Sequence, residues 1–367
     1  MIPYSKQSIN QDDIDAVVDV LKSDFLTQGP KIIEFENDLA SYCKATYAKV
    51  ANSATAALHL SYAAIGLKQG DIVWTTPNTF VATANAALYC GASVEFVDID
   101  PKTYNLSISC LKEKLVKAKK DNKLPKLVVP VHFSGQSCEM KDIWILSKEY
   151  GFKVIEDASH ALGGEYQDKK IGCCEYSDMT VFSFHPVKMI TTGEGGAIMT
   201  NNRDLEEKIA LLRTHGITKN SKNFKNVSDG DWYYEQQALG FNYRMTDIQA
   251  ALGISQLKRL DSFVEKRRKI ARCYLSELKE LILPYQHPDT NSSWHLFVVK
   301  IKDRKAVYQK LKSQEIITQV HYIPVNQQPF FDQEQLKNGA DFYNHCLSLP
   351  IYVDLTNQEQ LKVINNL

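Results

Sequence analysis

The eight cysteines of this 367-residue chain include no Cys-x-x-Cys pair. A zinc ribbon and a redox-active dithiol both need that spacing, so neither is supported. The nine histidines show neither a His-x-x-x-His nor a His-Glu-x-x-His spacing, and we therefore expect no metal site. Thiols scattered in this way indicate a protein of a reducing compartment.

The chain also lacks an excess of charge and a long hydrophobic run. Lysine and arginine number 43, as do aspartate and glutamate, so the formal net charge is zero. A balanced charge gives no strong field for nucleic acid or for a membrane surface. No apolar run approaches the roughly 18 residues of a membrane span, and the N-terminus lacks an apolar signal segment. We expect a cytoplasmic protein that binds neither nucleic acid nor membranes.

Three common motifs of catalysis and nucleotide binding are absent as well. There is no Gly-x-Gly-x-x-Gly, no Walker lysine and no Gly-x-Ser-x-Gly. Dinucleotide binding, nucleoside triphosphate chemistry and serine hydrolase chemistry are therefore unsupported.

The chain does have a regular alternation of strand-like and helical patterns up to about residue 200. Apolar runs typical of strands lie at 48–51, 72–75, 94–97, 127–131, 153–156, 180–184 and 197–200. Helical patterns lie between most of them, for example at 54–65, 79–89, 107–118 and 139–149. This alternation predicts an α/β fold, with a mainly parallel sheet covered on both faces. Such sheets bind ligands beyond the carboxyl ends of their strands.

Two amphipathic helices are expected before this region. Ile14, Val17, Val18 and Leu21 mark the apolar face of the first helix, and Asn10 is its expected cap. The second helix is expected within 32–43.

The remainder of the chain changes in pattern. Residues 218–238 fit either a disordered linker or an ordered lid or interface loop, and a long helical stretch is expected at 246–281. Beyond it we expect strands at 294–301 and 317–322 and a helix at 303–313. We therefore divide the chain into an N-terminal arm and large domain, 1–250, and a small C-terminal α+β domain, 251–367.

Lys188 is the first candidate for chemistry. It lies between a β-rich run that ends at Phe184 and a glycine cluster that begins at Gly193. A lysine in apolar surroundings loses its proton more easily, and a neutral amine can attack a carbonyl. The same pattern also fits a lysine that extends its charge into solvent from a strand end.

Three further stretches offer partners for such a lysine. Ser53, Ala54 and Thr55 follow a strand and open a helix, where backbone N–H groups can bind phosphate or simply be capped. Asp157 ends an apolar strand and can pair with a protonated pyridine nitrogen, or cap the next helix. His160 is close enough to reach the same ligand or to be structural, and Phe80 can stack on a flat ring or pack in the core.

A phosphate-binding turn, an aspartate, an aromatic side chain and a lysine on one α/β domain together fit pyridoxal 5′-phosphate. At this point the sequence resembles the DegT/DnrJ/EryC1/StrS sugar nucleotide aminotransferases over nearly its whole length. The matching segments are 26–29, 52–55, 79–85, 157–160, 182–188, 193–196, 240–244 and 320–324. The resemblance implies the aspartate aminotransferase fold (fold type I), with a seven-stranded sheet in the large domain.

The resemblance also implies roles for individual residues. Lys188 would form the Schiff base with the cofactor and move the proton, and Asp157 would pair with the pyridinium nitrogen. The other expected cofactor contacts are Ser53, Ala54, Thr55 and Ser183 at the phosphate, Phe80 and His160 at the ring, and Asn242 from the neighbouring subunit of a homodimer. The segments similar to those that line a nucleotide-sugar site are Tyr4, Asp24, Phe25, Leu26, Thr27, His321, Tyr322, Ile323 and Pro324.

Two segments resemble one branch of the family more closely, the PseC branch. They are Phe184-His185-Pro186-Val187-Lys188 and Trp232-Tyr233-Tyr234-Glu235-Gln236-Gln237. That branch transfers an amino group to C4 of a UDP-4-keto-6-deoxy-N-acetylhexosamine on the route to pseudaminic acid, a component of surface polysaccharide. The implied amino donor is L-glutamate and the implied product is UDP-4-amino-4,6-dideoxy-N-acetyl-β-L-altrosamine.

Alternative functions stay open at the level of sequence. One is a 4-aminotransferase for another nucleotide sugar, of the GDP-perosamine or 4-aminoarabinose type. A protein that binds pyridoxal phosphate without catalysis is a second. A sugar dehydratase is a third, but in those relatives a histidine replaces the lysine that is present here at position 188.

Overall fold

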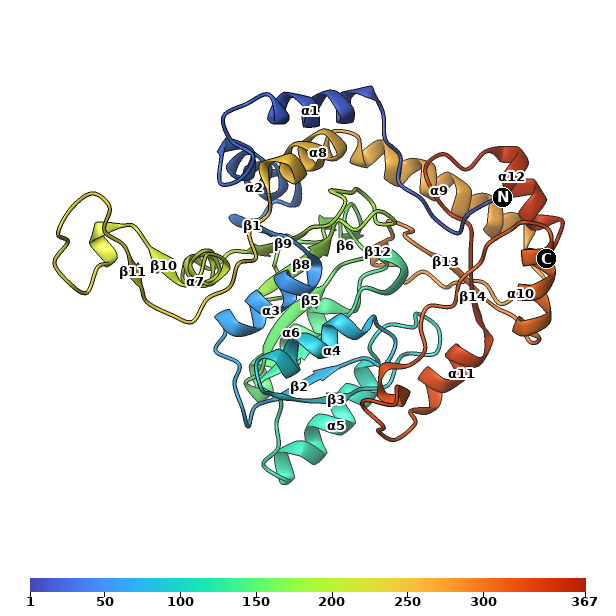
Figure 1. Ribbon diagram of the computed structural model, residues 1–367. Helices are drawn as coiled ribbons and strands as arrows, with labels where there is room; N and C mark the ends of the chain where they lie inside the picture. The colour runs from blue at the N-terminus through green and yellow to red at the C-terminus, as the bar shows by residue number, and fades with distance from the viewer.

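The computed structural model describes residues 1–367, and its centre is a seven-stranded sheet in the order β1-β9-β8-β5-β4-β2-β3 (Figure 1). Strand β9 is antiparallel to both of its neighbours, whereas the other pairs in the sheet are parallel. The α/β fold with a mainly parallel sheet is therefore confirmed. The strands are β1 (Tyr47–Ala51), β2 (Ile72–Thr75), β3 (Ser93–Phe96), β4 (Leu127–Val129), β5 (Lys153–Asp157), β8 (Met179–Ser183) and β9 (Gly196–Thr200).

Helices cover both faces of this sheet because its strands are apolar on both sides. Val181 packs with helices α3, α4 and α7 on one face, and its neighbour Phe182 packs on the other face with α2, α8 (Asp247–Leu257) and α9 (Leu260–Glu277). The helices around the sheet are α2 (Pro30–Cys43), α3 (Ala54–Ala64), α4 (Val81–Tyr89), α5 (Ile108–Lys120), α6 (Met140–Tyr150) and α7 (Arg203–Arg213). None of the helices is both long enough and apolar enough to span a membrane.

Helix α1 (Gln11–Leu21) begins with the expected cap. The Asn10 side chain accepts from the backbone N–H of Asp13, and the Asp13 side chain accepts from the backbone N–H of Asn10, which is a capping box. Asp13 is buried, and it also accepts from Ser255 and from Arg259. The cap of α1 therefore also joins it to the helical region that follows residue 246.

The long helical stretch expected at 246–281 is present but is interrupted. The structure has two helices, α8 (Asp247–Leu257) and α9 (Leu260–Glu277), with a break at Lys258 and Arg259. At the break the Arg259 guanidinium turns to Asp13 and to the carbonyl of Ser8. Because α8 packs on α1 and α2, the break allows α9 to continue towards the C-terminal part of the molecule.

The C-terminal part is built on strands β13 (Phe297–Lys300) and β14 (Cys346–Leu349), which pair antiparallel. The strand expected at 294–301 is shorter because Trp294 has a left-handed backbone, with φ at 54°. The expected strand at 317–322 is wrong: Gln319 pairs with Ser348, and the chain then turns to the cavity described below. The helices here are α10 (Arg304–Ser313), α11 (Lys337–His345) and α12 (Asn357–Ile364). The division of the chain at residue 250 stays a prediction.

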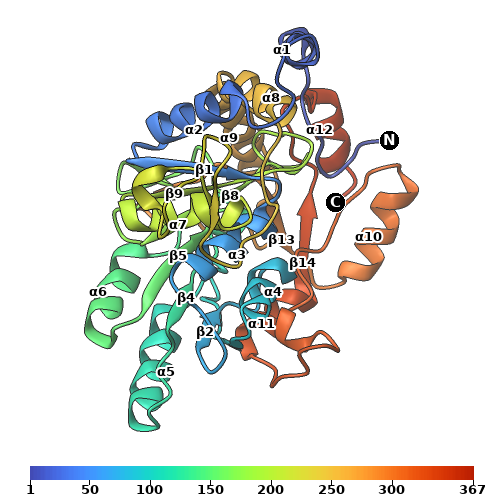
Figure 2. The same cartoon turned by 60° about the vertical axis from the view of Figure 1, so that its left-hand side comes forward.

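Short elements complete the molecule. They are β6 (Glu165–Tyr166), β7 (Lys169–Lys170), β12 (Thr290–Asn291), and the single turns η1 (Phe133–Gly135) and η3 (Val325–Gln327). An arm projects from the body between α7 and α8 (Figure 1), and in Figure 2 it is turned towards the viewer. It contains β10 (Ile217–Thr218), η2 (Ser221–Asn223) and β11 (Glu235–Gln236). The Glu235 carboxylate accepts from the backbone N–H groups of Lys225 and Asn226, so the arm is an ordered loop rather than a bare linker.

Candidate active site

A cavity of about 600 Å³ lies beyond the carboxyl ends of the parallel strands. Segments that are far apart in the sequence line it: the N-terminal arm, the first turn of α3, the ends of β5 and β8, and residues 319–322. Eleven of the site residues expected from the sequence are among its lining: Tyr4, Ser53, Ala54, Thr55, Phe80, Asp157, His160, Ser183, Lys188, His321 and Tyr322.

The other expected site residues do not line this cavity. The stretch Asp24, Phe25, Leu26 and Thr27 is exposed, as are Asn242 and Ile323, whereas Pro324 is buried beside the cavity lining. The roles expected for these residues stay predictions, and the role expected for Asn242 is one in the site of a neighbouring subunit.

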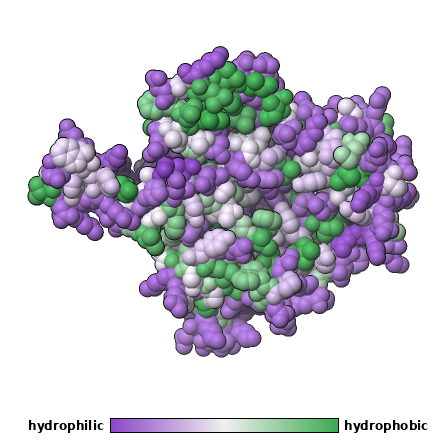
Figure 3. Space-filling view, viewed as in Figure 1, coloured by the Kyte–Doolittle hydropathy of each residue, from purple (hydrophilic) through white to green (hydrophobic).

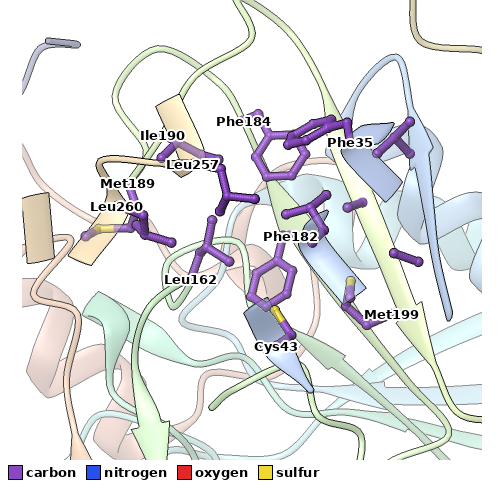
Figure 4. Close-up of a cluster of buried hydrophobic side chains, with 14 of the residues drawn as sticks. Phe35, Cys43, Leu162, Phe182, Phe184, Met189, Ile190, Met199, Leu257 and Leu260 are labelled. Atoms are coloured by element: carbon purple, nitrogen blue, oxygen red, sulfur yellow. The ribbon is translucent and has the colours of Figure 1, made fainter. Parts of the chain in front are cut away.

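The Lys188 turn is anchored by the residues that follow it. Met189 and Ile190 are buried in the core that Phe182 and Phe184 form with α2, α8 and α9 (Figure 4). Lys188 itself is half-buried and lines the cavity. Withdrawal of its ammonium group from bulk water lowers the pKa of Lys188 to about 8, although the negative charge of Asp157 acts to raise it. The site therefore holds a lysine that is partly neutral near pH 8.

Asp157 is held by hydroxyl groups from two directions. Its Oδ1 accepts from the backbone N–H of Ser159 at 3.1 Å and from Ser159 Oγ at 2.6 Å. Its Oδ2 accepts from Thr83 Oγ1 at 2.7 Å. Because β5 delivers Asp157 to the cavity already bonded in this way, the carboxylate has a fixed orientation.

The turn at 53–55 has the geometry of an anion-binding helix start. Ser53 is the cap of α3, and its side chain accepts from the backbone N–H of Ala56. The first N–H groups of a helix lack partners within the helix and carry partial positive charge. A Cβ on Gly196 would lie 2.7 Å from the backbone N of Ala54, so only glycine there allows β9 to approach this turn.

Three buried histidines surround the lysine: His160, His295 and His321. Burial, and then the charge of Lys188, lowers the pKa of His160 and of His295 well below the ordinary value, and lowers the pKa of His321 to about 3. All three are therefore neutral near pH 7.

The hydrogen bonds of His160 define which of its ring nitrogens carries the proton. The backbone N–H of Ser134 donates to His160 Nδ1 at 3.3 Å, so Nδ1 is the acceptor. The proton is then on Nε2, which donates to Tyr322 Oη at 3.0 Å. The Tyr322 hydroxyl proton is left free to point elsewhere in the cavity.

Sequence reasoning did not identify Thr83, Ser159 and His295. Thr83 and Ser159 lie inside segments that were recognised. The contact of Ser159 with Asp157 is local, two residues along the chain, whereas that of Thr83 depends on how α4 packs beside β5. His295 packs against His160 with its ring tilted by 48° and the ring centroids 4.5 Å apart, although 135 residues separate them in the chain. A histidine within the apolar run 294–301 was the available signal for it.

The donor set of this cavity fits pyridoxal phosphate. One cavity is lined by all three groups that this cofactor needs. Asp157 can accept from a protonated ring nitrogen, Lys188 is an amine with a lowered pKa, and the N-terminus of α3 can bind a phosphate. Phe80, which is 60% exposed, adds an aromatic face at the start of α4.

Known proteins are similar to this chain over nearly its whole length. The model of the DegT/DnrJ/EryC1/StrS aminotransferase family matches residues 7–367. A protein of Campylobacter jejuni named UDP-4-amino-4,6-dideoxy-N-acetyl-beta-L-altrosamine transaminase is 43% identical, over 97% of this chain and 93% of its own. The spore coat polysaccharide biosynthesis protein SpsC of Bacillus subtilis is 38% identical, over 99% of this chain and 95% of its own.

A solved structure is similar over the whole molecule. Helicobacter pylori PseC, an aminotransferase involved in the biosynthesis of pseudoaminic acid, superposes with a TM-score of 0.91 at 33% identity. The match covers 100% of this chain and 97% of that one. Aminotransferases of this kind depend on pyridoxal phosphate, so the cofactor expected from the sequence is confirmed. The chain belongs to the DegT/DnrJ/EryC1/StrS aminotransferase family.

Proposed function

We propose that this protein transfers an amino group from L-glutamate to C4 of a UDP-4-keto-6-deoxy-N-acetylhexosamine. The product would be UDP-4-amino-4,6-dideoxy-N-acetyl-β-L-altrosamine, a precursor of pseudaminic acid. The observation that carries the proposal is the meeting of Lys188, Asp157 and the first turn of α3 in one cavity. The choice of sugar rests on the 43% identity with the Campylobacter transaminase.

The cavity residues would hold the cofactor at three points. Ser53, Ala54, Thr55 and Ser183 would bind its phosphate, and Asp157 would accept the proton of its ring nitrogen. Phe80 and His160 would contact the ring. When bound, pyridoxal phosphate supplies an aldehyde that bonds reversibly to amines and a ring that withdraws electrons from the neighbouring carbon.

Lys188 Nζ would carry the proton in both halves of the reaction. As a neutral amine it accepts a proton from the Cα of glutamate, and as an ammonium it returns a proton to the carbon that receives the amine. A pKa of about 8 suits both tasks, because both protonation states are substantially populated near pH 8. The three neutral histidines add no positive charge that would oppose the ammonium form.

We propose further that two chains share each site in a homodimer. Asn242 and the stretch 24–27 are exposed and lie outside the cavity lining of their own chain, which supports a role for them at the cavity of another subunit. Apolar side chains on α1 and α2 are exposed beside this stretch, as the upper part of Figure 3 shows; they include Ile14, Leu21 and Ile33. Exposed apolar patches of this kind are typical of protein interfaces.

The compartment is a separate part of the proposal. All eight cysteines are free, including the adjacent Cys173 and Cys174. Unpaired thiols are usual in the cytoplasm, where we propose that the reaction takes place.

Reduction with borohydride tests the lysine and the cofactor together. The purified holoenzyme is reduced, digested and analysed by mass spectrometry, and we expect a pyridoxyl adduct on Lys188 alone. Lys188→Ala should give no adduct and no turnover, whereas Lys153→Ala, which changes an exposed lysine, should behave as the wild type. An adduct on another lysine would contradict the proposal.

A second candidate differs only in the sugar. Because the chain is also similar to SpsC, other 4-keto nucleotide sugars belong in the test. They include those of the GDP-perosamine and 4-aminoarabinose types. Formation of 2-oxoglutarate from glutamate is measured with a panel of such sugars, and the product is identified by NMR. Turnover of the UDP-4-keto-6-deoxy-N-acetylhexosamine alone supports the proposal. Cofactor binding without turnover of any sugar would favour a non-catalytic protein.

A further inference from the structure

A chain of hydroxyl groups runs through the buried side of the cavity to Asp157. Thr79 Oγ1 lies 2.7 Å from Thr83 Oγ1, which in turn lies 2.7 Å from Asp157 Oδ2. The exposed fractions of Thr79 and Thr83 are 2% and 1%, so bulk water cannot replace either hydrogen bond. Thr79 precedes α4 and Thr83 lies in its first turn, which places the pair against the end of β5.

The direction of each hydrogen bond follows from the acceptor at the end of the chain. An ionised carboxylate only accepts, so the single proton of the Thr83 hydroxyl must point to Asp157 Oδ2. The Thr83 oxygen then accepts from Thr79, whose own proton is used in that bond. Thr79 therefore orients Thr83, and Thr83 orients Asp157.

The two oxygens of Asp157 differ in how far they are satisfied. Oδ1 accepts two hydrogen bonds, both from Ser159. Oδ2 accepts one, from Thr83, and a carboxylate oxygen has room for two. The open acceptor position of Asp157 is thus on the oxygen that Thr83 holds.

We propose that Thr83 is a positioning residue that holds Asp157 Oδ2 ready for the ring nitrogen of pyridoxal phosphate, with Thr79 holding Thr83. Thr83 does not react. It stabilises the carboxylate by a charge-assisted hydrogen bond and fixes the angle at which the carboxylate meets the ring. The inference rests on the proposed function only in requiring that the cofactor ring meets Asp157.

The test compares Thr83→Val, which keeps the shape of the side chain and removes the hydroxyl, with Thr83→Ser, which keeps the hydroxyl. Loss of a hydrogen bond to a charged group should weaken the binding of pyridoxal phosphate to the apoprotein by about 10- to 100-fold. Thr83→Ser should stay within about threefold of the wild type, and Thr79→Val should fall between the two because Thr83 keeps its own bond.

A second readout reports on the ring nitrogen itself. Cofactor labelled at that nitrogen is bound at saturation and observed by NMR. In Thr83→Val the resonance should move towards that of the unprotonated ring, and in Thr83→Ser it should not.

Thr75→Val is the matched control. Thr75 is a fully buried threonine in β2, and its hydroxyl donates to the carbonyl of Val129 at 2.9 Å, away from the cavity. We expect this variant to lower the Tm of the apoprotein without changing the affinity for the cofactor or the ring resonance. If Thr83→Val resembles Thr75→Val in both respects, Thr83 is merely structural and the inference is overturned. If the wild-type protein itself binds no pyridoxal phosphate, the proposed function fails instead.

Discussion

Lys188 is the residue whose protonation limits when the cavity can react with an aldehyde. Two influences on its amine oppose each other. Withdrawal from water favours the neutral form, and the negative charge of Asp157 favours the ammonium. The first is larger, and the resulting pKa of about 8 makes the neutral fraction small at pH 6 and dominant at pH 9.

We therefore expect the rate at which the apoprotein captures pyridoxal phosphate to follow the neutral fraction of Lys188. Because the pKa is lowered, the rate should rise roughly tenfold per pH unit below pH 8 and level off above it. Rapid-mixing absorbance measurements would give this profile. Asp157→Asn should move the midpoint to lower pH, since the charge that raises the pKa is lost. A midpoint near the ordinary lysine value would show that the amine is fully solvated.

The sequence was sufficient to identify residues whose position follows from the end of an element. Ser53 and Asp157 come directly after apolar strands, and parallel strands bring their carboxyl ends to one edge. Thr83 and His295 could not be identified in this way. Their importance depends on which direction a side chain takes from α4 or from the start of β13, and only packing determines that direction.

At the scale of elements, the capping box of α1 also fastens the N-terminal arm. Asp13 is buried and accepts hydrogen bonds from Ser255, Gln256 and Arg259 in addition to its capping bond. Removal of the Asp13 carboxylate would leave these three side chains without their hydrogen-bond acceptor. The Arg259 side chain is 25% exposed, so water can replace part of what its guanidinium loses.

We expect Asp13→Ala to lower the free energy of unfolding by about 2–3 kcal/mol, less than the loss of a fully buried ion pair. Urea denaturation monitored by circular dichroism measures it. Asp12→Ala is the matched control, because Asp12 lies in the same first turn but is exposed, and it should cost about 0.5 kcal/mol or less. Equal effects of the two substitutions would contradict a special role for the buried carboxylate.

The projecting arm depends on one carboxylate in a similar way. Hydrogen bonds from the backbone N–H groups of Lys225 and Asn226, and from the side chains of Gln237 and Tyr233, lower the pKa of Glu235 to about 2. The pKa of Glu235 in the folded protein is below its ordinary value, so these hydrogen bonds stabilise the arm fully above about pH 4.5. This stabilisation is lost as the pH falls towards 2 and the carboxylate gains a proton.

Glu235→Ala should therefore increase the rate of limited proteolysis within residues 219–234 several-fold at neutral pH. Gel electrophoresis and mass spectrometry of the fragments measure this rate. Glu265→Ala, which removes an exposed carboxylate paired with Arg272 on α9, should leave it unchanged. An unchanged rate in Glu235→Ala would mean that the arm is ordered by other contacts.

The accuracy of sequence prediction also differs among elements. All seven strands of the central sheet were predicted, because buried parallel strands are short, apolar and bounded by polar turns. The break between α8 and α9 was not predicted, since apolar periodicity continues through it, and the pairing of Arg259 with Asp13 at the break depends on tertiary packing. The stretch 317–322 has the composition of a strand, but its side chains line the cavity instead of pairing.

At the scale of the whole molecule, one chain brings most of the expected cofactor contacts into one cavity but leaves part of the expected site on its surface. Lys188, Asp157 and Ser53 line the cavity of a single chain. Asn242 is exposed outside that cavity, and its backbone carbonyl accepts from Asn52, next to the turn at 53–55. An exposed residue beside the turn at 53–55 is well placed to face the same region of a second copy across a two-fold axis.

A mixing experiment distinguishes a shared site from a site within one chain. Lys188→Ala and Asn242→Ala are each expected to have little activity. If Asn242 serves the partner's site, a mixed dimer of the two variants has one site with both Lys188 and Asn242 intact. Subunits exchanged at random from equal amounts should then recover about a quarter of the wild-type activity, since half of the dimers are mixed and one of their two sites works.

The control for this recovery is a mixture of Lys188→Ala with Ser53→Ala. Ser53 lines the same cavity as Lys188 within one chain, so no pairing of these two variants rebuilds an intact site. The activity of this mixture should equal the sum of the activities of the two separate variants. That result would exclude the possibility that one variant simply stabilises the other. Absence of recovery in the Lys188→Ala and Asn242→Ala mixture, once subunit exchange is shown by native mass spectrometry, would mean that each chain acts without its partner's Asn242. The surface position of Asn242 would then have to be explained by the stability of the dimer instead of by the chemistry of the site.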